Sequence, residues 1–175
     1  MAGLTQDTHV FEYGVPSQPA AWPVGANQQL YIGSVALQSG SGSVTTGYLK
    51  NAASPGTADV VVGMLAEPSG GTYVQTGPGI VGGTTDGAVW ADVQPGAFFF
   101  QSGTGNDQIS ATQNGKTVYY GGENANGPIA CATSATSTRP VLGILLPQDP
   151  GIAGGFSPGS SYWPVKLNPA VLPSI

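Results

Sequence analysis

Glycine and proline recur along the whole chain and confine its apolar residues to short runs. The 175 residues include 28 glycines and 15 prolines, while apolar residues make up 40% of the chain. Turn signals built from these residues return at intervals of about 8–15 residues, which is typical of a β-sandwich or barrel. No segment shows a convincing helical period. We therefore predict an all-β fold with many turns, in a chain about one domain long.

The apolar runs between the turns give the expected strands. They span residues 29–38, 44–50, 58–65, 88–94, 97–102, 117–120, 128–133, 139–149 and 161–167, with a short strand at 73–76 inside a Gly-rich stretch. Val60, Val61 and Val62 follow one another without a polar residue, which favours a strand buried on both faces. In "AFFFQ" (97–101) the middle phenylalanine must face opposite to its neighbours, so one side of that strand is core. Residues 109–115 are expected to hold one short helical turn.

The two ends of the chain differ in pattern from the middle. Residues 1–27 hold three prolines and scattered aromatic residues without a strand or helix period, so we predict an extended N-terminal arm. Residues 28–168 are predicted to form a single β-domain, and 169–175 a C-terminal tail broken by two prolines. Each aromatic side chain left in water forfeits roughly 2 kcal/mol of burial. We therefore expect the two ends to contact a partner through Phe11, Tyr13, Trp22, Val171, Leu172 and Ile175.

The chain carries few charges. Charged residues make up only 7% of it, against roughly 25% in ordinary globular domains. A protein with so few charged residues is expected to belong to an assembly in which neighbouring molecules cover most of its surface. The net charge is −5. Four scattered cations cannot neutralise a run of phosphates, which argues against nucleic-acid binding; they are Lys50, Lys116, Arg139 and Lys166.

No segment has the pattern of a membrane anchor or of a secretion signal. The longest apolar run, residues 141–147, is far too short to span a bilayer, and no basic amphipathic helix is present. The N-terminus lacks the basic and apolar regions of a signal peptide, so we expect synthesis in a cytoplasm. Cys131 is the only cysteine, which excludes an internal disulfide. It is expected to be a small strand residue.

The stretch "NGKT" (114–117) admits two interpretations. Its end matches a phosphate-binding loop, but such a loop needs a glycine five positions before Gly115, where the chain has Ser110. Asn114-Gly115 is also the strongest short signal for a β-hairpin, since a type I′ turn needs a positive φ at both central residues. We therefore predict a hairpin turn at Asn114-Gly115, with Lys116 as a solvent-exposed charge at a strand edge.

Residues able to carry out catalysis are sparse. His9 is the only histidine and lies in the predicted arm, so neither a Ser-His-Asp relay nor a zinc site can be assembled in the usual way. Asp86, Asp92 and Asp107 lie in or beside Gly-rich turns, where acidic side chains usually cap backbone N–H groups. We therefore predict no enzymatic activity, no cofactor and no metal, including at Lys116 and Thr117.

The order of the strand motifs carries a resemblance. "ADVVVGML", "QPGAFFFQSGTGNDQISATQNGKTVYY", "RPVLGILLPQD" and "YWPVKL" follow one another over residues 58–167. This order resembles the small capsid decoration (cement) proteins of tailed bacteriophages. In that family an aliphatic strand with Gly and Phe precedes an Asp…Gly…Thr-Val-Tyr segment, a Gly-containing strand and a short closing Val-rich strand. The resemblance spans about residues 28–168 and is most specific over 96–146.

The resemblance implies both a fold and a function. It implies a small β-sandwich or jelly roll, or a β-tulip-like barrel, on the exterior of a virion made in a bacterial cytoplasm. Such proteins catalyse no reaction, bind across joints between major capsid protein subunits as dimers or trimers, and stabilise the head. Copies that contact several capsomers gain tight binding through effective concentration. The partners implied are the major capsid protein and the protein itself, with no nucleic acid and no membrane.

Two other functions are consistent with the residues. A carbohydrate-binding or fibre-type adhesion module would need an exposed aromatic platform beside polar groups on a rigid face. The aromatic residues available for it are Trp90, Phe98, Phe99, Phe100, Tyr119, Tyr120, Tyr162 and Trp163. A hydrolase that used the turn carboxylates would need two of them about 5–9.5 Å apart in a cleft.

Overall fold

The fold is all-β, as the turn spacing predicts. The computed structural model describes residues 19–53, 55–66, 79–135, 139–148 and 161–167. The strands are β1 (Ala20–Pro23), β2 (Gln29–Leu30), β3 (Val35–Gln38), β4 (Leu49–Lys50), β5 (Val60–Leu65), β6 (Ile80–Val81), β7 (Trp90–Gln94), β8 (Ala97–Ser102), β9 (Thr117–Asn124), β10 (Gly127–Cys131), β11 (Val141–Leu145) and β12 (Tyr162–Leu167). Two short 3-10 helices, η1 (Gly105–Asp107) and η2 (Ala111–Gln113), lie between β8 and β9. The expected strand at 73–76 lies outside the described residues.

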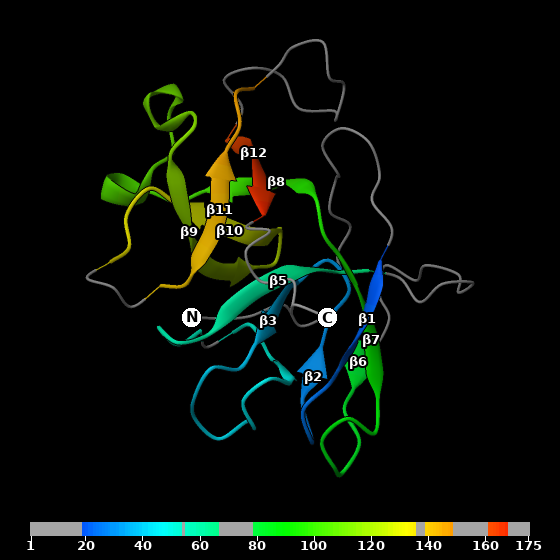
Figure 1. Cartoon of the computed structure of the whole chain (residues 1–175). Helices are drawn as coiled ribbons and strands as arrows, with labels where there is room; N and C mark the ends of the chain where they lie inside the picture. Colours follow the sequence, from blue (N-terminus) through cyan, green and yellow to red (C-terminus); the bar gives the residue numbers. More distant parts are fainter. Residues whose placement is uncertain (1–18, 54, 67–78, 136–138, 149–160, 168–175) are drawn as a thin grey trace.

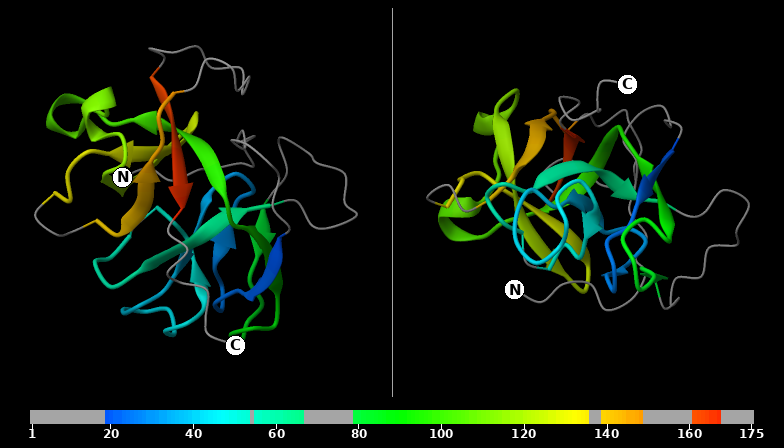
Figure 2. Two further views of the ribbon diagram at one scale, coloured as in Figure 1. Left: turned by 45° about the horizontal axis from the view of Figure 1, so that its top comes forward. Right: turned by 60° about the horizontal axis from the view of Figure 1, so that its bottom comes forward.

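The strands form an open sheet and a closed barrel (Figure 1). The first half of the chain gives a five-stranded sheet of order β1-β7-β5-β3-β4, and β2 and β6 make a separate two-stranded sheet. The second half gives a five-stranded closed barrel of order β10-β8-β12-β11-β9, in which β10 and β8 pair in parallel. Figure 2 shows the barrel, coloured green to red, on one side of the sheet, coloured blue to green. A barrel against a sheet is thus the architecture, rather than a two-sheet sandwich or jelly roll.

Strand β5 lies between two hydrophobic cores. Val61 and Met64 belong to the core shared by the sheet and the barrel, while Val62 and Leu65 belong to a second core on the opposite side of the sheet. Successive side chains of a strand point to opposite faces, so apolar residues at consecutive positions fit a strand covered on both sides. The prediction of a doubly buried strand at residues 60–62 is confirmed.

The barrel contributes most of the residues of the core that it shares with the sheet. Its aromatic members from the barrel are Phe98 and Phe100 of β8, Tyr120 of β9 and Trp163 of β12, and all four are buried. Phe99, which faces the opposite way on β8, is also buried, at 6% exposure. Both sides of this strand are therefore covered, and none of its three phenylalanines is exposed.

The predicted arm extends too far into the fold. Residues 20–23 form β1, which pairs with β7 from Ala20 opposite Val93 to Pro23 opposite Trp90. The side chain of Trp22 belongs to the second core and is only 9% exposed. The arm prediction is therefore wrong for residues 20–27, and Trp22 is a core residue rather than a partner contact. Four residues are too few to show a two-residue period, and Pro23 is tolerated because β1 is an edge strand.

Two predicted strands are shorter or broken. Residues 29–38 divide into β2 and β3 at a turn in which the backbone N–H of Ser34 donates to the carbonyl of Tyr31, with Gly33 at a φ of 84°. Of residues 44–50 only Leu49 and Lys50 form a strand. The other expected strands within the described residues are present with boundaries shifted by a few residues.

The turn at Asn114-Gly115 is present, but it is not a hairpin. Helix η2 precedes it, so it leads from a helical turn into β9 rather than from one strand into the next. The backbone N–H of Lys116 donates to the carbonyl of Gln113 at 2.8 Å. Asn114 has φ −50° and ψ 129°, and Gly115 has φ 77°, which are the angles of a type II turn instead of type I′. The exclusion of a phosphate-binding loop is confirmed, because a strand and not a helix follows Lys116, which is exposed.

Candidate functional site

Asp86, one of the carboxylates predicted to lie in turns, bonds to the backbone of the protein itself. The side chain of Asp86 accepts a hydrogen bond from the backbone N–H of Ala26 at 2.7 Å. Hydrogen bonds from the side chain of Thr45 and from Ala26 hold the pKa of Asp86 below its usual value. Asp86 thus caps a backbone N–H group as predicted, but the group belongs to Ala26, sixty positions away in the chain, and not to its own turn. Among the described residues, no group of three or more His, Cys, Asp and Glu side chains is placed to bind a metal ion.

Asp107 joins the 3-10 region to the segment before β11. Its Oδ1 lies 2.7 Å from Nη1 of Arg139 and accepts a hydrogen bond from the hydroxyl of Thr133 at 2.5 Å. The guanidinium bond to Arg139, followed by the Thr133 bond, holds the pKa of Asp107 below its usual value. The charges of Asp107 and Arg139 are therefore paired with each other within the fold. Cys131, nearby at the end of β10, is a strand residue as predicted, and it is buried.

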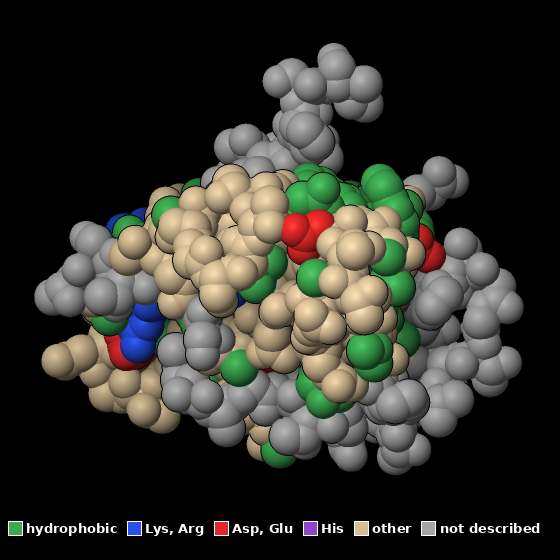
Figure 3. All heavy atoms as spheres, turned by 90° about the horizontal axis from the view of Figure 1, so that it is seen from below, with side chains coloured by type: hydrophobic (Ala, Val, Ile, Leu, Met, Phe, Trp, Pro, Cys, Tyr) green, Lys and Arg blue, Asp and Glu red, His purple; other side chains and the backbone are tan. Residues whose placement is uncertain are grey.

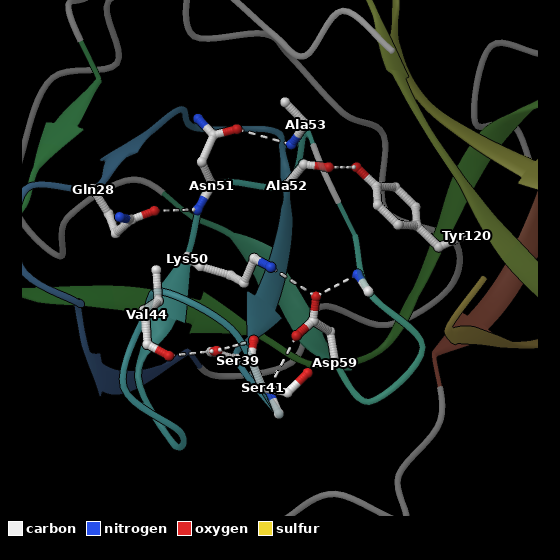
Figure 4. A network of polar contacts seen from close by, with 12 residues as sticks. Gln28, Ser39, Ser41, Val44, Lys50, Asn51, Ala52, Ala53, Asp59 and Tyr120 are labelled. Atoms are coloured by element: carbon white, nitrogen blue, oxygen red, sulfur yellow. Dashed lines mark hydrogen bonds and ion pairs between the residues drawn. The ribbon is translucent and has the colours of Figure 1, made fainter. Parts of the chain in front are cut away.

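A polar network fixes the loops around β3, β4 and β5 (Figure 4). Asp59 is fully shielded from solvent and forms a 2.9 Å ion pair with Lys50. Its two carboxylate oxygens also accept the backbone N–H groups of Gly40 at 3.0 Å and Gly56 at 2.6 Å. Every one of these partners is part of the protein's own fold. Asp59 is therefore a structural carboxylate that holds two loops, with no oxygen turned to a ligand.

A second buried carboxylate joins the barrel to the sheet. Glu123 of β9 is 5% exposed and accepts hydrogen bonds from the hydroxyl of Ser34 at 2.5 Å and the backbone N–H of Val35 at 2.9 Å. Tyr120, on the same strand, donates its hydroxyl to the carbonyl of Ala52 at 3.1 Å. Burial, and then the nearby charge of Glu123, raise the pKa of Tyr120 well above its usual value. These contacts define the junction of the two halves of the fold.

A groove runs between the barrel and the segment that leads into β5. It has a volume of about 510 Å³ and is lined on one side by residues 57–61 and on the other by Tyr119, Ser134 and residues 139–141. Its cation, Arg139, is paired with Asp107, and its carboxylate, Asp59, is paired with Lys50. Val141 is exposed at 40%. The groove therefore offers no nucleophile with a neighbouring base.

The largest exposed apolar side chain of the described residues is Trp90, on β7. It is 60% exposed, whereas Ala91 and Val93, which face the other way, are buried. Cross-strand pairing places Pro23 opposite Trp90 and Ala21 opposite Asp92. We call this surface, formed by Ala21, Pro23, Trp90 and Asp92, the Trp90 face. In Figure 3, hydrophobic side chains gather beside acidic ones on the side of the molecule where Figure 1 draws β1, β6 and β7.

The side of the sheet that carries the Trp90 face is covered by the barrel at other strands. Gln94 lies two positions beyond Asp92 on β7 and pairs with Met64, whose side chain is in the core shared with the barrel. The barrel thus covers the sheet at β3 and β5, and its cover ends before the Trp90 face. Sequence reasoning identified Trp90 only as one of eight aromatic candidates. The alternation in "WADVQ" is the signal that sets Trp90, Asp92 and Gln94 on one side.

Both ends of the described fold meet near one end of β7. Ala20, the first residue of β1, pairs with Val93. Leu167, the last residue of β12, donates its backbone N–H to the carbonyl of Gly96 at 2.9 Å. Residues 1–18 and 168–175 therefore join the fold within a few residues of each other along β7. The predicted contact residues Phe11, Tyr13, Val171, Leu172 and Ile175 lie in these segments, outside the described residues.

Comparison of the chain with protein-family models, with curated proteins and with solved structures found no match. Within the described residues, no helix is long and apolar enough to cross a membrane.

Proposed function

We propose that this protein decorates the exterior of a tailed-bacteriophage head and stabilises it without catalysing a reaction. In this proposal it binds the major capsid protein across subunit joints, as a dimer or trimer, after synthesis in the host cytoplasm. The order of the strand motifs supports the proposal through its resemblance to capsid decoration proteins. The low charge content also supports it, because a protein that is only 7% charged is suited to an assembly that covers its faces.

The observation that carries the proposal is the way the N-terminal segment is anchored. Residues 1–18 lead directly into edge strand β1, which is paired with β7 along its whole length. The side chain of Trp22 holds β1 in the second core, since it is 9% exposed and packs among the residues of that core. A segment tethered in this way can transmit load from a capsid contact into the sheet. Phe11 and Tyr13 would then each contribute roughly 2 kcal/mol by burial on the capsid.

Truncation of the N-terminal segment tests the proposal. A variant lacking residues 1–18 retains β1 and Trp22, so its circular dichroism and thermal transition should match those of the full chain. Its occupancy on purified capsids, measured by co-sedimentation over a concentration series, should fall. A full-length Phe11→Ser/Tyr13→Ser variant is the matched control for chain length and should lose most of the same binding. Equal occupancy by the full and truncated chains would contradict the proposed attachment, and no sedimentation of the full chain with any head would contradict the function.

Trp90 supports a second candidate function, a carbohydrate-binding or fibre-type adhesion module. An exposed indole on a strand, with Asp92 on the same side, is the kind of platform on which a sugar ring can stack. Nuclear magnetic resonance titration with a panel of cell-surface glycans should then shift the Trp90 indole signal, and Trp90→Ala should abolish binding. Glycan binding that survives Trp90→Ala would exclude this site.

A further inference from the structure

We propose that the Trp90 face is one end of a longer strip that binds an extended, uncharged glycan of at least three pyranose rings. The aromatic strip, as we call it, is formed by Tyr48, Pro23 and Trp90. The proposal rests on the second candidate function, the carbohydrate-binding module, and names the class of glycan that this site takes. It also adds Tyr48 as a second residue on which a sugar ring stacks.

Tyr48 lies on the same side of the sheet as Trp90, with Pro23 between them. Leu49, the next residue along the chain, is buried in the second core, so the partly exposed side chain of Tyr48 points away from that core. An isolated parallel bridge joins Leu49 to Val24, and this bridge brings Tyr48 beside Pro23. On its other side, Pro23 is opposite Trp90. The three side chains therefore come from three neighbouring segments of the sheet.

Gly87 shows how close Tyr48 and Pro23 come to each other. A methyl group added at Gly87 would lie 3.3 Å from Cε1 of the Tyr48 ring and 3.9 Å from Cβ of Pro23. Both side chains thus border one spot on the surface. The glycine at that spot has a φ of 75° and brings no side chain of its own. The Tyr48 ring, the Pro23 ring and the Trp90 indole follow one another across the sheet.

The spacing of the aromatic strip suits successive sugar rings. Neighbouring strands lie about 4.8 Å apart, so the backbones at Tyr48 and Trp90, on either side of Pro23, are about 10 Å apart. A pyranose ring advances an extended glycan by a length similar to one strand spacing. In a β-1,4-linked glycan each ring is turned over relative to the one before, so alternate rings present the same face. Two alternate rings can therefore stack on Tyr48 and Trp90, while the ring between them lies over Pro23.

The charges beside the aromatic strip favour a neutral ligand. Asp92 lies on the same side of β7, and Asp86 is exposed in the loop that leads into β7. Lys50 follows Tyr48 by two positions, but its charge is paired with buried Asp59. Carboxylates repel glycans that carry uronic acid, sialic acid or sulfate groups. They accept hydrogen bonds from the hydroxyl groups of a neutral sugar.

Titration with oligosaccharides of graded length tests the proposal on the unmodified protein. The probes are β-1,4-linked N-acetylglucosamine oligomers of one to six rings, which are uncharged. Binding is measured by calorimetry and by the nuclear magnetic resonance signal of the Trp90 indole. The affinity should rise about two- to tenfold from the disaccharide to the trisaccharide, which is the first to reach both aromatic rings, and level off beyond it. Oligomers of β-1,4-linked mannuronate, which are acidic, should bind more weakly at every length.

The variant Tyr48→Ala separates this proposal from the second candidate function itself. It should lower the affinity for the trisaccharide about two- to tenfold and leave that for the disaccharide unchanged. Tyr48→Phe is the matched control, because it keeps the ring, and it should bind like the parent. Trp90→Ala should abolish binding at every length, and thermal unfolding of each variant reports whether the fold is intact.

The outcomes distinguish failure of the proposal from failure of the candidate function. An affinity that does not depend on length, an equal effect of Tyr48→Ala on both oligomers, or stronger binding of the acidic oligomers would overturn the proposal and leave a glycan site at Trp90. No binding of either series would overturn the candidate function and the proposal with it. Since no capsid is used, none of these results bears on capsid decoration.

Discussion

At the scale of single residues, Glu123 is a buried carboxylate whose hydrogen-bond partners come from the other half of the chain. A carboxylate that is 5% exposed is costly to bury unless its oxygens are bonded. Ser34 and Val35 of the sheet supply those bonds to a residue of the barrel. The three residues therefore form a specific link between two halves of the chain that are about ninety positions apart.

Replacement of Glu123 by alanine should destabilise the protein by about 2–6 kcal/mol. The reason is that two buried donors, the Ser34 hydroxyl and the Val35 N–H, lose their acceptor, at about 1–3 kcal/mol each. Glu123→Gln is the matched control, because its side chain keeps an acceptor oxygen, and it should cost less. Urea unfolding followed by circular dichroism gives both values. An alanine variant as stable as the glutamine variant would show that the link is not needed.

Tyr120 should make the protein sensitive to alkaline pH. Its pKa in the folded state is raised well above the usual value of 10.0, first by burial and then by the charge of Glu123. Below pH 10 the hydroxyl is protonated in both states and this contribution to stability is complete. Above pH 10 the unfolded chain loses the proton while the folded chain keeps it, so stability falls.

The variant Tyr120→Phe isolates this effect. At neutral pH it should cost about 1 kcal/mol, because the bond to the Ala52 carbonyl is lost. Between pH 9 and 11 its free energy of unfolding should decline less steeply than that of the parent. Parallel declines in urea titrations at matched pH would assign the alkaline sensitivity to other groups.

At the scale of elements, the barrel depends on close approach between β11 and β12. Gly143 of β11 pairs with Leu167, and a methyl group added at Gly143 would lie 2.0 Å from the carbonyl oxygen of Lys166. That atom belongs to the backbone of the neighbouring strand and cannot rotate away. The absence of a side chain at this position therefore lets β12 pair with β11 and close the barrel.

Gly143→Ala should destabilise the protein by about 3 kcal/mol or more, since the two strands must separate to admit the methyl group. Ile144→Ala on the same strand is the control, because Ile144 is 39% exposed and its truncation should cost no more than about 1 kcal/mol. Thermal unfolding of both variants gives the comparison. Similar small losses in the two variants would show that the barrel tolerates a wider gap between β11 and β12.

At the scale of the whole molecule, one core serves both halves. Val35, Leu37, Val61 and Met64 from the sheet share a single hydrophobic cluster with residues of β8, β9, β11 and β12. Neither half keeps this cluster out of water without the other. The sheet and the barrel are therefore expected to fold as one cooperative unit, although they are contiguous and separate in sequence.

Hydrogen exchange can measure this cooperativity. Amides in the centre of β5, such as Val62, and in the centre of β9, such as Tyr120, should exchange with the same free energy of opening. That shared value should also respond equally to added denaturant. If the amides of β5 exchanged at a clearly lower free energy than those of β9, the sheet would open on its own and the shared core would not couple the two halves.

Features that depend on neighbours along the chain could be predicted from the order of the residues. The all-β class follows from turn residues at short intervals, and the doubly buried β5 follows from consecutive valines. The turn at Asn114-Gly115 and the absence of a phosphate-binding loop follow from local residue types. For Asp86 the residue type predicted a bond to a backbone N–H group, but the donor is Ala26, sixty positions away, which no local pattern specifies.

Features that depend on residues far apart in the chain could be seen only in the folded structure. Trp22 is in the core because β1 pairs with residues 90–93, and nothing in the four residues of β1 encodes that partner. The division into sheet and barrel and the bonds to Glu123 depend on non-local pairing in the same way. Trp90 is exposed because the barrel's cover ends at β5. Strand side chains gain most of their free energy from cross-strand and cross-layer neighbours, and a linear pattern does not specify which neighbours those are.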